Sequence, residues 1–175
     1  ETLPLLNAAY EVRKKYWGRD VTVHILNNVQ NGSCSEDCSY CAQSAKSKAE
    51  IKCYPMKNEA EIMEEARVAY ESGAFRYCMV FSGRGPSAKR IDKLTNIIKE
   101  IKKRYPIEVC VSPGKIDKKD AERLKAAGLD RLNHNLNTSE SYYSEICSTH
   151  KYQERFKTIE AAKSVGLEVC SGLIV

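Results

Sequence analysis

A regular alternation of short apolar runs with longer helix-like segments is the feature that most constrains the fold. Strand-like runs occur at residues 21–29, 75–81, 107–112, 131–136 and from 167 onward. Helix-like segments lie between them at 58–72, 88–104, 117–127 and 152–165, and an amphipathic helix is expected at 5–17. Strands that alternate with helices in this way predict βα units and a parallel sheet.

The length limits how much of a parallel barrel this sequence can supply. A barrel of eight βα units usually takes about 250 residues, whereas the chain has 175. No low-complexity linker divides it, and the last strand-like run is still open at Val175. We therefore expect an α/β fold in one partial domain, residues 1–175, with about five units of an incomplete (β/α) TIM barrel.

Composition narrows the class of protein. Hydrophobic residues make up 42% and charged residues 29%, which is ordinary for a globular domain. No apolar run approaches the roughly 20 residues that span a membrane, and the first residues lack the features of a secretory signal, so a cytoplasmic protein is expected. The net charge of +5 comes from lysines in helix-like stretches and indicates a solvated outer face rather than nucleic-acid binding.

Three of the eight cysteines form the strongest motif. Cys34, Cys38 and Cys41 follow the first predicted strand with Cys-x3-Cys-x2-Cys spacing. A structural zinc site usually needs four protein ligands, and dense disulfides belong to small secreted chains. Three thiolates in one loop instead predict an iron–sulfur cluster with one iron left open to a small molecule. The carboxyl end of a parallel strand is where such a ligand is expected.

Three more cysteines repeat a pattern on later strands. Cys78, Cys110 and Cys170 each stand two residues after a charged residue, and the residue between the two is apolar in each case. Since strand side chains alternate between two faces, the cysteines should point into the barrel lumen at similar depth. They are either ligands of a second cluster or ordinary small buried residues.

The string Gly-Ser-Cys-Ser-Glu-Asp-Cys-Ser-Tyr-Cys-Ala-Gln-Ser at 32–44 resembles the radical S-adenosylmethionine (SAM) superfamily, and the biotin synthase family in particular. The resemblance continues at 77–80, 82–86, 133–139 and 169–172. It implies a radical SAM TIM barrel that converts dethiobiotin to biotin. A 4Fe–4S cluster on the triplet would generate a 5′-deoxyadenosyl radical from SAM, and a 2Fe–2S cluster on Cys78, Cys110 and Cys170 would supply sulfur.

The resemblance also implies roles for particular residues and partners. Contacts with SAM fall on Tyr40, Asn135, Asn137 and Arg155, and contacts with dethiobiotin on Asn133 and Asn135. No catalytic side chain is implied beyond the cofactor ligands, and the arginine that completes the 2Fe–2S site would lie beyond Val175. The implied partners are dethiobiotin, a reductant such as flavodoxin or ferredoxin, and a second subunit in a full-length homodimer, with no nucleic acid and no membrane.

Some residues depart from the pattern or stand outside it. Asn137 replaces the aspartate usual in the family, and Gln30 replaces a frequent lysine. Cys53 and Cys147 match no ligand and are expected to be incidental thiols. The histidines His24, His134 and His150 show no ligand spacing, and His134 is expected to be a hydrogen-bonded core residue.

Two other functions remain open. Another radical SAM enzyme on the same scaffold, similar to methylornithine synthase or to a hydrogenase maturase, would share the triplet. A mutase needs no sulfur donor, however, so the lumen cysteines count against it. A non-catalytic iron–sulfur electron carrier is the third possibility, and the row of asparagines counts against that one.

Overall fold

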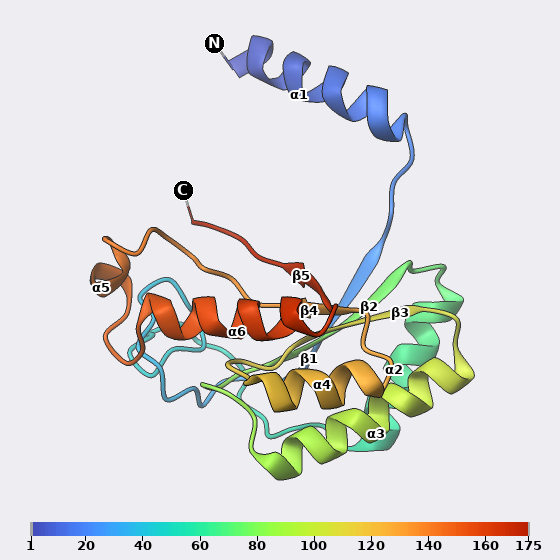
Figure 1. Ribbon diagram of the computed structural model, residues 1–175, viewed down its shortest axis with the longest axis vertical. Helices are drawn as coiled ribbons and strands as arrows, with labels where there is room; N and C mark the ends of the chain where they lie inside the picture. The colour runs from blue at the N-terminus through green and yellow to red at the C-terminus, as the bar shows by residue number, and fades with distance from the viewer. Residues whose placement is uncertain (1, 175) are drawn as a thin grey trace.

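The computed structural model describes residues 2–174, and its element order confirms the predicted alternation (Figure 1). The helices are α1 (Thr2–Trp17), α2 (Glu59–Glu71), α3 (Ala88–Arg104), α4 (Lys118–Ala126), α5 (Tyr143–Ile146) and α6 (Tyr152–Ser164). The strands are β1 (His24–Gln30), β2 (Arg76–Phe81), β3 (Glu108–Ser112), β4 (Arg131–Asn133) and β5 (Glu168–Cys170). They form one sheet in chain order, and every neighbouring pair is parallel.

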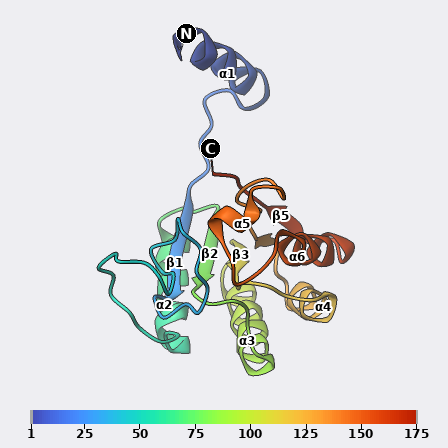
Figure 2. The same ribbon diagram turned by 90° about the vertical axis from the view of Figure 1, so that its left-hand side faces the viewer.

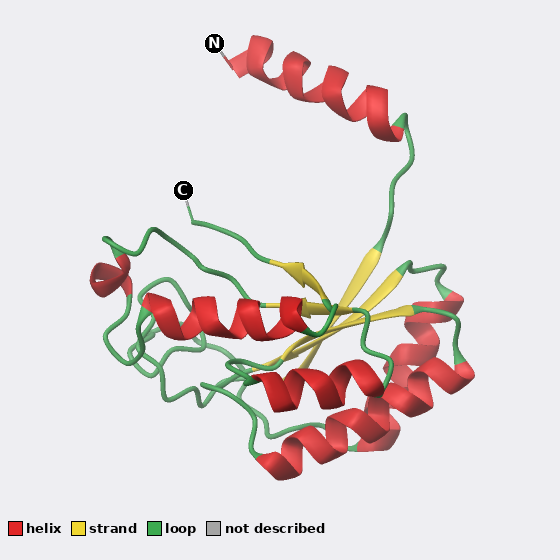
Figure 3. Ribbon diagram, viewed as in Figure 1, coloured by secondary structure: helices red, strands yellow, loops and turns green. Residues whose placement is uncertain are grey.

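Helices α2, α3, α4 and α6 lie on one side of this sheet (Figures 2 and 3). Tyr77, Met79, Val109, Val111 and Leu132 project from the strands into the layer between sheet and helices, where all five are fully buried. Burying a large apolar side chain contributes about 1.5–3 kcal/mol, so this layer is the main source of stability. The opposite face of the sheet, which we call the inner face, carries Arg76, Cys78, Glu108, Cys110 and Cys170, as the alternation predicts.

Helix boundaries follow local capping chemistry. The Asn58 side chain accepts a hydrogen bond from the backbone N–H of Glu61 at 2.9 Å, and the Glu61 carboxylate accepts one from the backbone N–H of Asn58 at 3.0 Å. This reciprocal capping box was expected from the sequence and begins α2. Helix α3 has the predicted bounds, and α4 and α6 match them to within one residue at each end.

The strand ends differ from the prediction. Strand β1 begins at His24 rather than Val21, because its pairing with β2 begins at Arg76. Strand β4 ends at Asn133 rather than Leu136, and Asn137 adopts a left-handed backbone with φ 72°. A residue in that conformation leaves the extended alternation, so Asn137 does not continue the row of Asn133 and Asn135. Helix α5 was not predicted.

Helix α1 stands apart from the sheet and its covering helices (Figure 1). None of its residues is buried, although an amphipathic helix was expected here. Its end is held by Arg13, which donates to the carbonyls of Gly18 at 2.7 Å and Asp20 at 2.5 Å. Across residues 2–174, no helix combines the length and the apolar character needed to cross a membrane.

The loops after β2 and β3 touch through two glycines. The backbone N–H of Lys115 donates to the carbonyl of Arg84 at 2.8 Å. A Cβ on Gly114, whose φ is +90°, would lie 2.6 Å from that carbonyl oxygen, and a Cβ on Gly85 would lie 2.5 Å from the carbonyl oxygen of Lys115. Only glycine permits this approach, which places Arg84 and Lys115 together at the carboxyl end of the sheet.

Gly114→Ala should destabilise the fold more than Gly166→Ala. Both glycines have a positive φ, which costs a substituted alanine roughly 1–2 kcal/mol, but a Cβ on Gly166 meets nothing within 4 Å. The overlap with the Arg84 backbone adds to the strain only at position 114. Urea unfolding of the two variants measures the difference, and equal losses would contradict this account of the loop contact.

Candidate functional site

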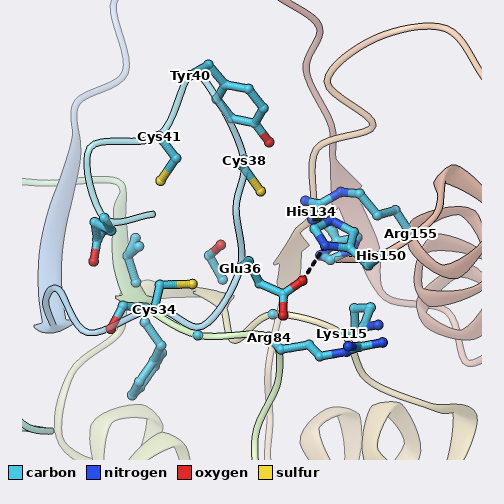
Figure 4. Close-up of a pocket in the computed structure, with 17 residues that line it drawn as sticks. Cys34, Glu36, Cys38, Tyr40, Cys41, Arg84, Lys115, His134, His150 and Arg155 are labelled. Carbon is cyan, nitrogen blue, oxygen red and sulfur yellow. Dashed lines mark hydrogen bonds and ion pairs between the residues drawn. The ribbon is translucent and has the colours of Figure 1, made fainter. Parts of the chain in front are cut away.

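The cysteine triplet lines a cavity at the carboxyl ends of the strands (Figure 4). Cys34, Cys38 and Cys41 all come from the loop after β1, as the sequence predicts. The cavity has a volume of about 210 Å³. The rest of its wall comes from the loops after β2, β3 and β4 and from the start of α6, and includes Arg84, Lys115, His134, His150 and Arg155.

Asp37 anchors this cysteine loop. Its buried carboxylate accepts hydrogen bonds from the backbone N–H groups of Ser148 at 2.9 Å and Thr149 at 3.1 Å, and from Lys46 Nζ at 2.9 Å. The hydrogen bond from the Ser148 hydroxyl, followed by that from Lys46, holds the pKa of Asp37 far below its usual range. The carboxylate therefore stays charged and ties the loop after β1 to the segment after α5.

Glu36 makes a second link between the same segments. Its carboxylate accepts from the Thr149 hydroxyl at 2.9 Å and pairs with His150 Nδ1. Burial raises the pKa of Glu36, but the hydrogen bonds from Thr149 and His150 outweigh it and leave that pKa lowered. Burial first, and then the charges of Arg155 and Lys115, leave the pKa of His150 lowered although Glu36 raises it. Figure 4 shows this pair between the cysteine loop and the cationic side of the cavity.

Three cationic side chains form the wall opposite the cysteine loop (Figure 4). Arg84 pairs with Glu154 at 3.0 Å, and Lys115 pairs with the same carboxylate. Arg155 donates through Nε to the carbonyl of Asn135, and its NH1 lies 3.5 Å from His150 Nε2. The cavity thus faces sulfur donors on one side and positive charge on the other, an arrangement that suits a ligand with a carboxylate.

His134 differs from its prediction. It is buried at 2% exposure, as expected, but it lines the cavity, and its Nε2 has no hydrogen-bond partner among residues 2–174. Burial first, and then the charge of Arg155, lower its pKa to about 3. The imidazole is therefore neutral near pH 7, and Nε2 is available to a ligand rather than satisfied by the core.

The structure groups some of the predicted SAM residues and separates others. Tyr40 and Arg155 line the cavity with the triplet, whereas Asn133, Asn135 and Asn137 do not. Asn135 reaches the site through its backbone carbonyl, which binds Arg155. Asn137 is buried, and its Nδ2 has no partner within the described chain. The roles expected for the asparagine side chains stay predictions.

The inner-face cysteines lie on β2, β3 and β5, and they are not all at one level. Cys78 and Cys110 are direct register partners on β2 and β3. Cys170 pairs with Asn133, whereas Cys110 pairs with Arg131, so Cys170 lies two residues further toward the carboxyl end. The expected equal depth therefore holds only for the first two. A hydrogen bond with Cys110 lowers the pKa of Cys78, and burial opposes it.

The sequence analysis gave neither Cys147 nor His150 a role as a ligand. Cys147, expected to be an incidental thiol, is buried, with its Sγ 3.8 Å from the Sγ of Cys38 and 3.3 Å from His150 Nδ1. The Cys-x2-His spacing of these two residues is short enough for one metal site and was the available signal. By contrast, Cys53 is exposed, and His24 lies beside Arg76 on the sheet.

Comparison with protein families decides the classification. The model of the radical SAM superfamily matches residues 29–175. The chain belongs to the radical SAM superfamily. That match begins within β1 and includes both sets of cysteines.

Curated relatives that match nearly the whole chain include biotin synthases. The chain is 59% identical over 175 residues to biotin synthase of Magnetococcus marinus, covering all of this chain and 54% of the relative. It is 53% identical over 174 residues to biotin synthase of Acaryochloris marina, covering 99% and 50%. The chain thus spans about half the length of the curated relatives it matches.

Solved structures of radical SAM enzymes share the fold. Methylornithine synthase superposes with a TM-score of 0.84 at 22% identity, covering 97% of this chain and 50% of that structure. The FeFe-hydrogenase maturase from Carboxydothermus hydrogenoformans gives a TM-score of 0.81 at 23% identity, covering 94% and 39%. At these identities the likeness concerns the fold, and it supports the prediction of a partial radical SAM barrel.

Glu154→Gln should lower the stability of the fold at neutral pH. The variant should then lose less stability than the wild type as the pH falls. Lys115 first, and then the backbone N–H of Lys151, lower the pKa of Glu154 from 4.5 to about 2. A lowered carboxyl pKa contributes stability above about pH 4.5 that is lost as the pH falls toward about 2. Urea unfolding across this range, with the exposed Glu122→Gln as control, measures the effect. Parallel pH profiles for wild type and Glu154→Gln would contradict it.

Proposed function

We propose that this chain is the N-terminal part of a biotin synthase, which inserts sulfur into dethiobiotin in a SAM-dependent radical reaction. The observation that carries the proposal is the 59% identity to a biotin synthase over a stretch that includes both sets of cysteines. The inner-face cysteines add to it, since a sulfur donor needs a site apart from the triplet. Sulfur insertion is the reaction type that uses both.

The triplet fits a 4Fe–4S cluster. Cys34, Cys38 and Cys41 are the only cysteines among the residues that line the cavity, so three irons receive thiolates and one is left for the ligand. When bound, the cluster supplies the electron that cleaves SAM to a 5′-deoxyadenosyl radical. The protein's own part is to hold the three sulfurs on one wall, through the anchored loop, and to present cations on the other.

The same cavity fits the amino-acid end of SAM. Its volume of about 210 Å³ is below the roughly 300–1,000 Å³ typical of ligand pockets, so the adenosine would extend past its rim. Tyr40 lies at that rim with 43% of its surface exposed, where its ring can support the adenine. Arg155 would bind the carboxylate, and the neutral Nε2 of His134 can accept a hydrogen bond from the ligand.

Cys78, Cys110 and Cys170 fit a 2Fe–2S cluster on the inner face. When bound, that cluster supplies the sulfur atom of the product. Asn133 is the direct register partner of Cys170, so an amide suited to a ureido ring stands beside the sulfur donor. Asn135 follows it in the chain, and this order supports a dethiobiotin site between the two clusters. The fourth ligand, an arginine, would come from sequence beyond Val175.

The proposed partners follow from this chemistry. Dethiobiotin is the small-molecule substrate, and a flavodoxin or ferredoxin would deliver electrons to the triplet cluster. The full-length enzyme would be a homodimer. The three inner-face cysteines favour this reaction over a mutase on the same scaffold, because a carbon-skeleton rearrangement consumes no sulfur.

Replacing Cys34 with Ala in the full-length protein should abolish SAM cleavage. Without that thiolate one iron loses its anchor, and a cluster with a single open iron cannot form. Anaerobic reconstitution followed by Mössbauer spectroscopy measures the cluster, and Cys53→Ala is the matched control because Cys53 is exposed. The assignment fails if Cys34→Ala keeps an intact, site-differentiated cluster that cleaves SAM.

Replacing Cys78, Cys110 or Cys170 with Ala should separate the two functions. Each variant should form no biotin but still cleave some SAM, because radical generation depends on the triplet and sulfur supply on the inner face. Product analysis and 5′-deoxyadenosine release are measured together, again with Cys53→Ala as control. An equal loss of biotin in the control would show that the wrong thiols were chosen.

A further inference from the structure

Cys38, Cys147 and His150 form a compact group of metal-binding side chains. All three are buried, and their candidate ligand atoms lie within 4.8 Å of one another. Among residues 2–174, this is the only group of three or more His, Cys, Asp or Glu ligands that meets this limit. It is distinct from the full triplet, because Cys147 and His150 come from the segment after α5.

Two of the three distances between the ligand atoms suit a single tetrahedral ion. Zinc binds cysteine sulfur at about 2.3 Å and histidine nitrogen at about 2.0–2.1 Å. A tetrahedron with these bonds separates two sulfurs by about 3.8 Å and a sulfur from a nitrogen by about 3.5 Å. The Cys38 and Cys147 sulfurs are 3.8 Å apart, and Cys147 Sγ lies 3.3 Å from His150 Nδ1.

The surroundings resemble the outer shell of a metal site. The other imidazole nitrogen, His150 Nε2, lies 2.9 Å from the Tyr143 hydroxyl, a contact that can fix the tautomer with Nδ1 facing the sulfurs. Asp37 Oδ1 lies 3.4 Å from Cys147 Sγ, and Glu36 contacts His150 Nδ1 itself. The metal therefore takes the place of the hydrogen bond between Nδ1 and Glu36, and the Glu36 carboxylate is left beside the ion. Two buried carboxylates therefore stand beside the three ligands, and they favour a divalent cation there.

From this geometry we propose that Cys38, Cys147 and His150 form a second, mononuclear site for a thiophilic divalent metal such as Zn²⁺, with water as fourth ligand. The site shares Cys38 with the triplet, so the ion and the cluster compete for one thiolate. Zinc therefore occupies the protein only when the triplet carries no cluster, and it opposes cluster assembly. Metal binding releases the thiol protons of Cys38 and Cys147 and involves no redox step.

The test uses the full-length protein without clusters, under anaerobic conditions, with Co²⁺ as a spectroscopic substitute for zinc. In a Cys34→Ala, Cys41→Ala background the triplet cannot chelate, but Cys38 remains. We expect ligand-field and thiolate charge-transfer bands of one tetrahedral Co²⁺ that depend on Cys147. Adding Cys147→Ala should remove that bound Co²⁺, whereas adding Cys53→Ala should leave it bound. Both triple variants keep Cys78, Cys110 and Cys170, so any Co²⁺ on those cysteines is the same in the two.

Two further variants test the geometry. His150→Ala should weaken Co²⁺ binding at least about 10-fold, and Tyr143→Phe should weaken it about 10–100-fold through the outer shell. The proposal is overturned if Cys147→Ala leaves the number and affinity of tetrahedral Co²⁺ unchanged. Circular dichroism of each variant verifies that the fold persists.

A second experiment keeps the triplet intact. Zn²⁺ added before iron and sulfide should slow assembly of the 4Fe–4S cluster, and Cys147→Ala should relieve that inhibition while assembling a normal cluster. Undiminished inhibition in Cys147→Ala would again overturn the proposal. Neither experiment measures biotin formation, so the outcome is independent of the proposed enzymatic function.

Discussion

The site depends on one electrostatic anchor, the buried carboxylate of Asp37. The segment from Asn31 to Lys57 contains no helix and no strand longer than an isolated bridge, so the sheet alone does not fix its path. Asp37 takes hydrogen bonds from Ser148 and Thr149, more than 100 residues away. A buried carboxylate is costly unless such donors surround it. The chain therefore holds the cysteine loop against the far side of the cavity whenever it folds.

The alternation of side chains along the strands organises the rest of the structure. In β2 and β3, one face supplies the apolar layer under the helices and the other supplies cysteine and charge. Because neighbouring strands are parallel and in register, Cys78 and Cys110 meet without any contribution from a loop. The two proposed cluster sites thus depend on different parts of the structure. Sheet register positions one, and a loop anchored by carboxylates positions the other.

Local chemistry explains why much of this was predictable. Asn58, Glu61 and Gly73 predict where α2 begins and ends, and the alternation of side chains predicts which face of β2 is buried. The spacing of the cysteine triplet is visible directly in the sequence. What the sequence did not show depends on long-range contacts or on one dihedral angle. The turn at Asn137, the unpartnered His134 Nε2 and the contact of Cys38 with Cys147, 109 residues away, all belong to this second kind.

The three cationic side chains that line the cavity differ in whether a carboxylate balances their charge. Arg84 and Lys115 share the carboxylate of Glu154, so one of their two positive charges is matched. Arg155 has no carboxylate partner within residues 2–174, since its contacts are the Asn135 carbonyl and the His150 ring. A guanidinium held by a neutral carbonyl keeps its charge and several donors for a ligand. Arg155 is therefore the group best able to bind a carboxylate. The backbone of Asn135, more than its side chain, sets the position of that guanidinium.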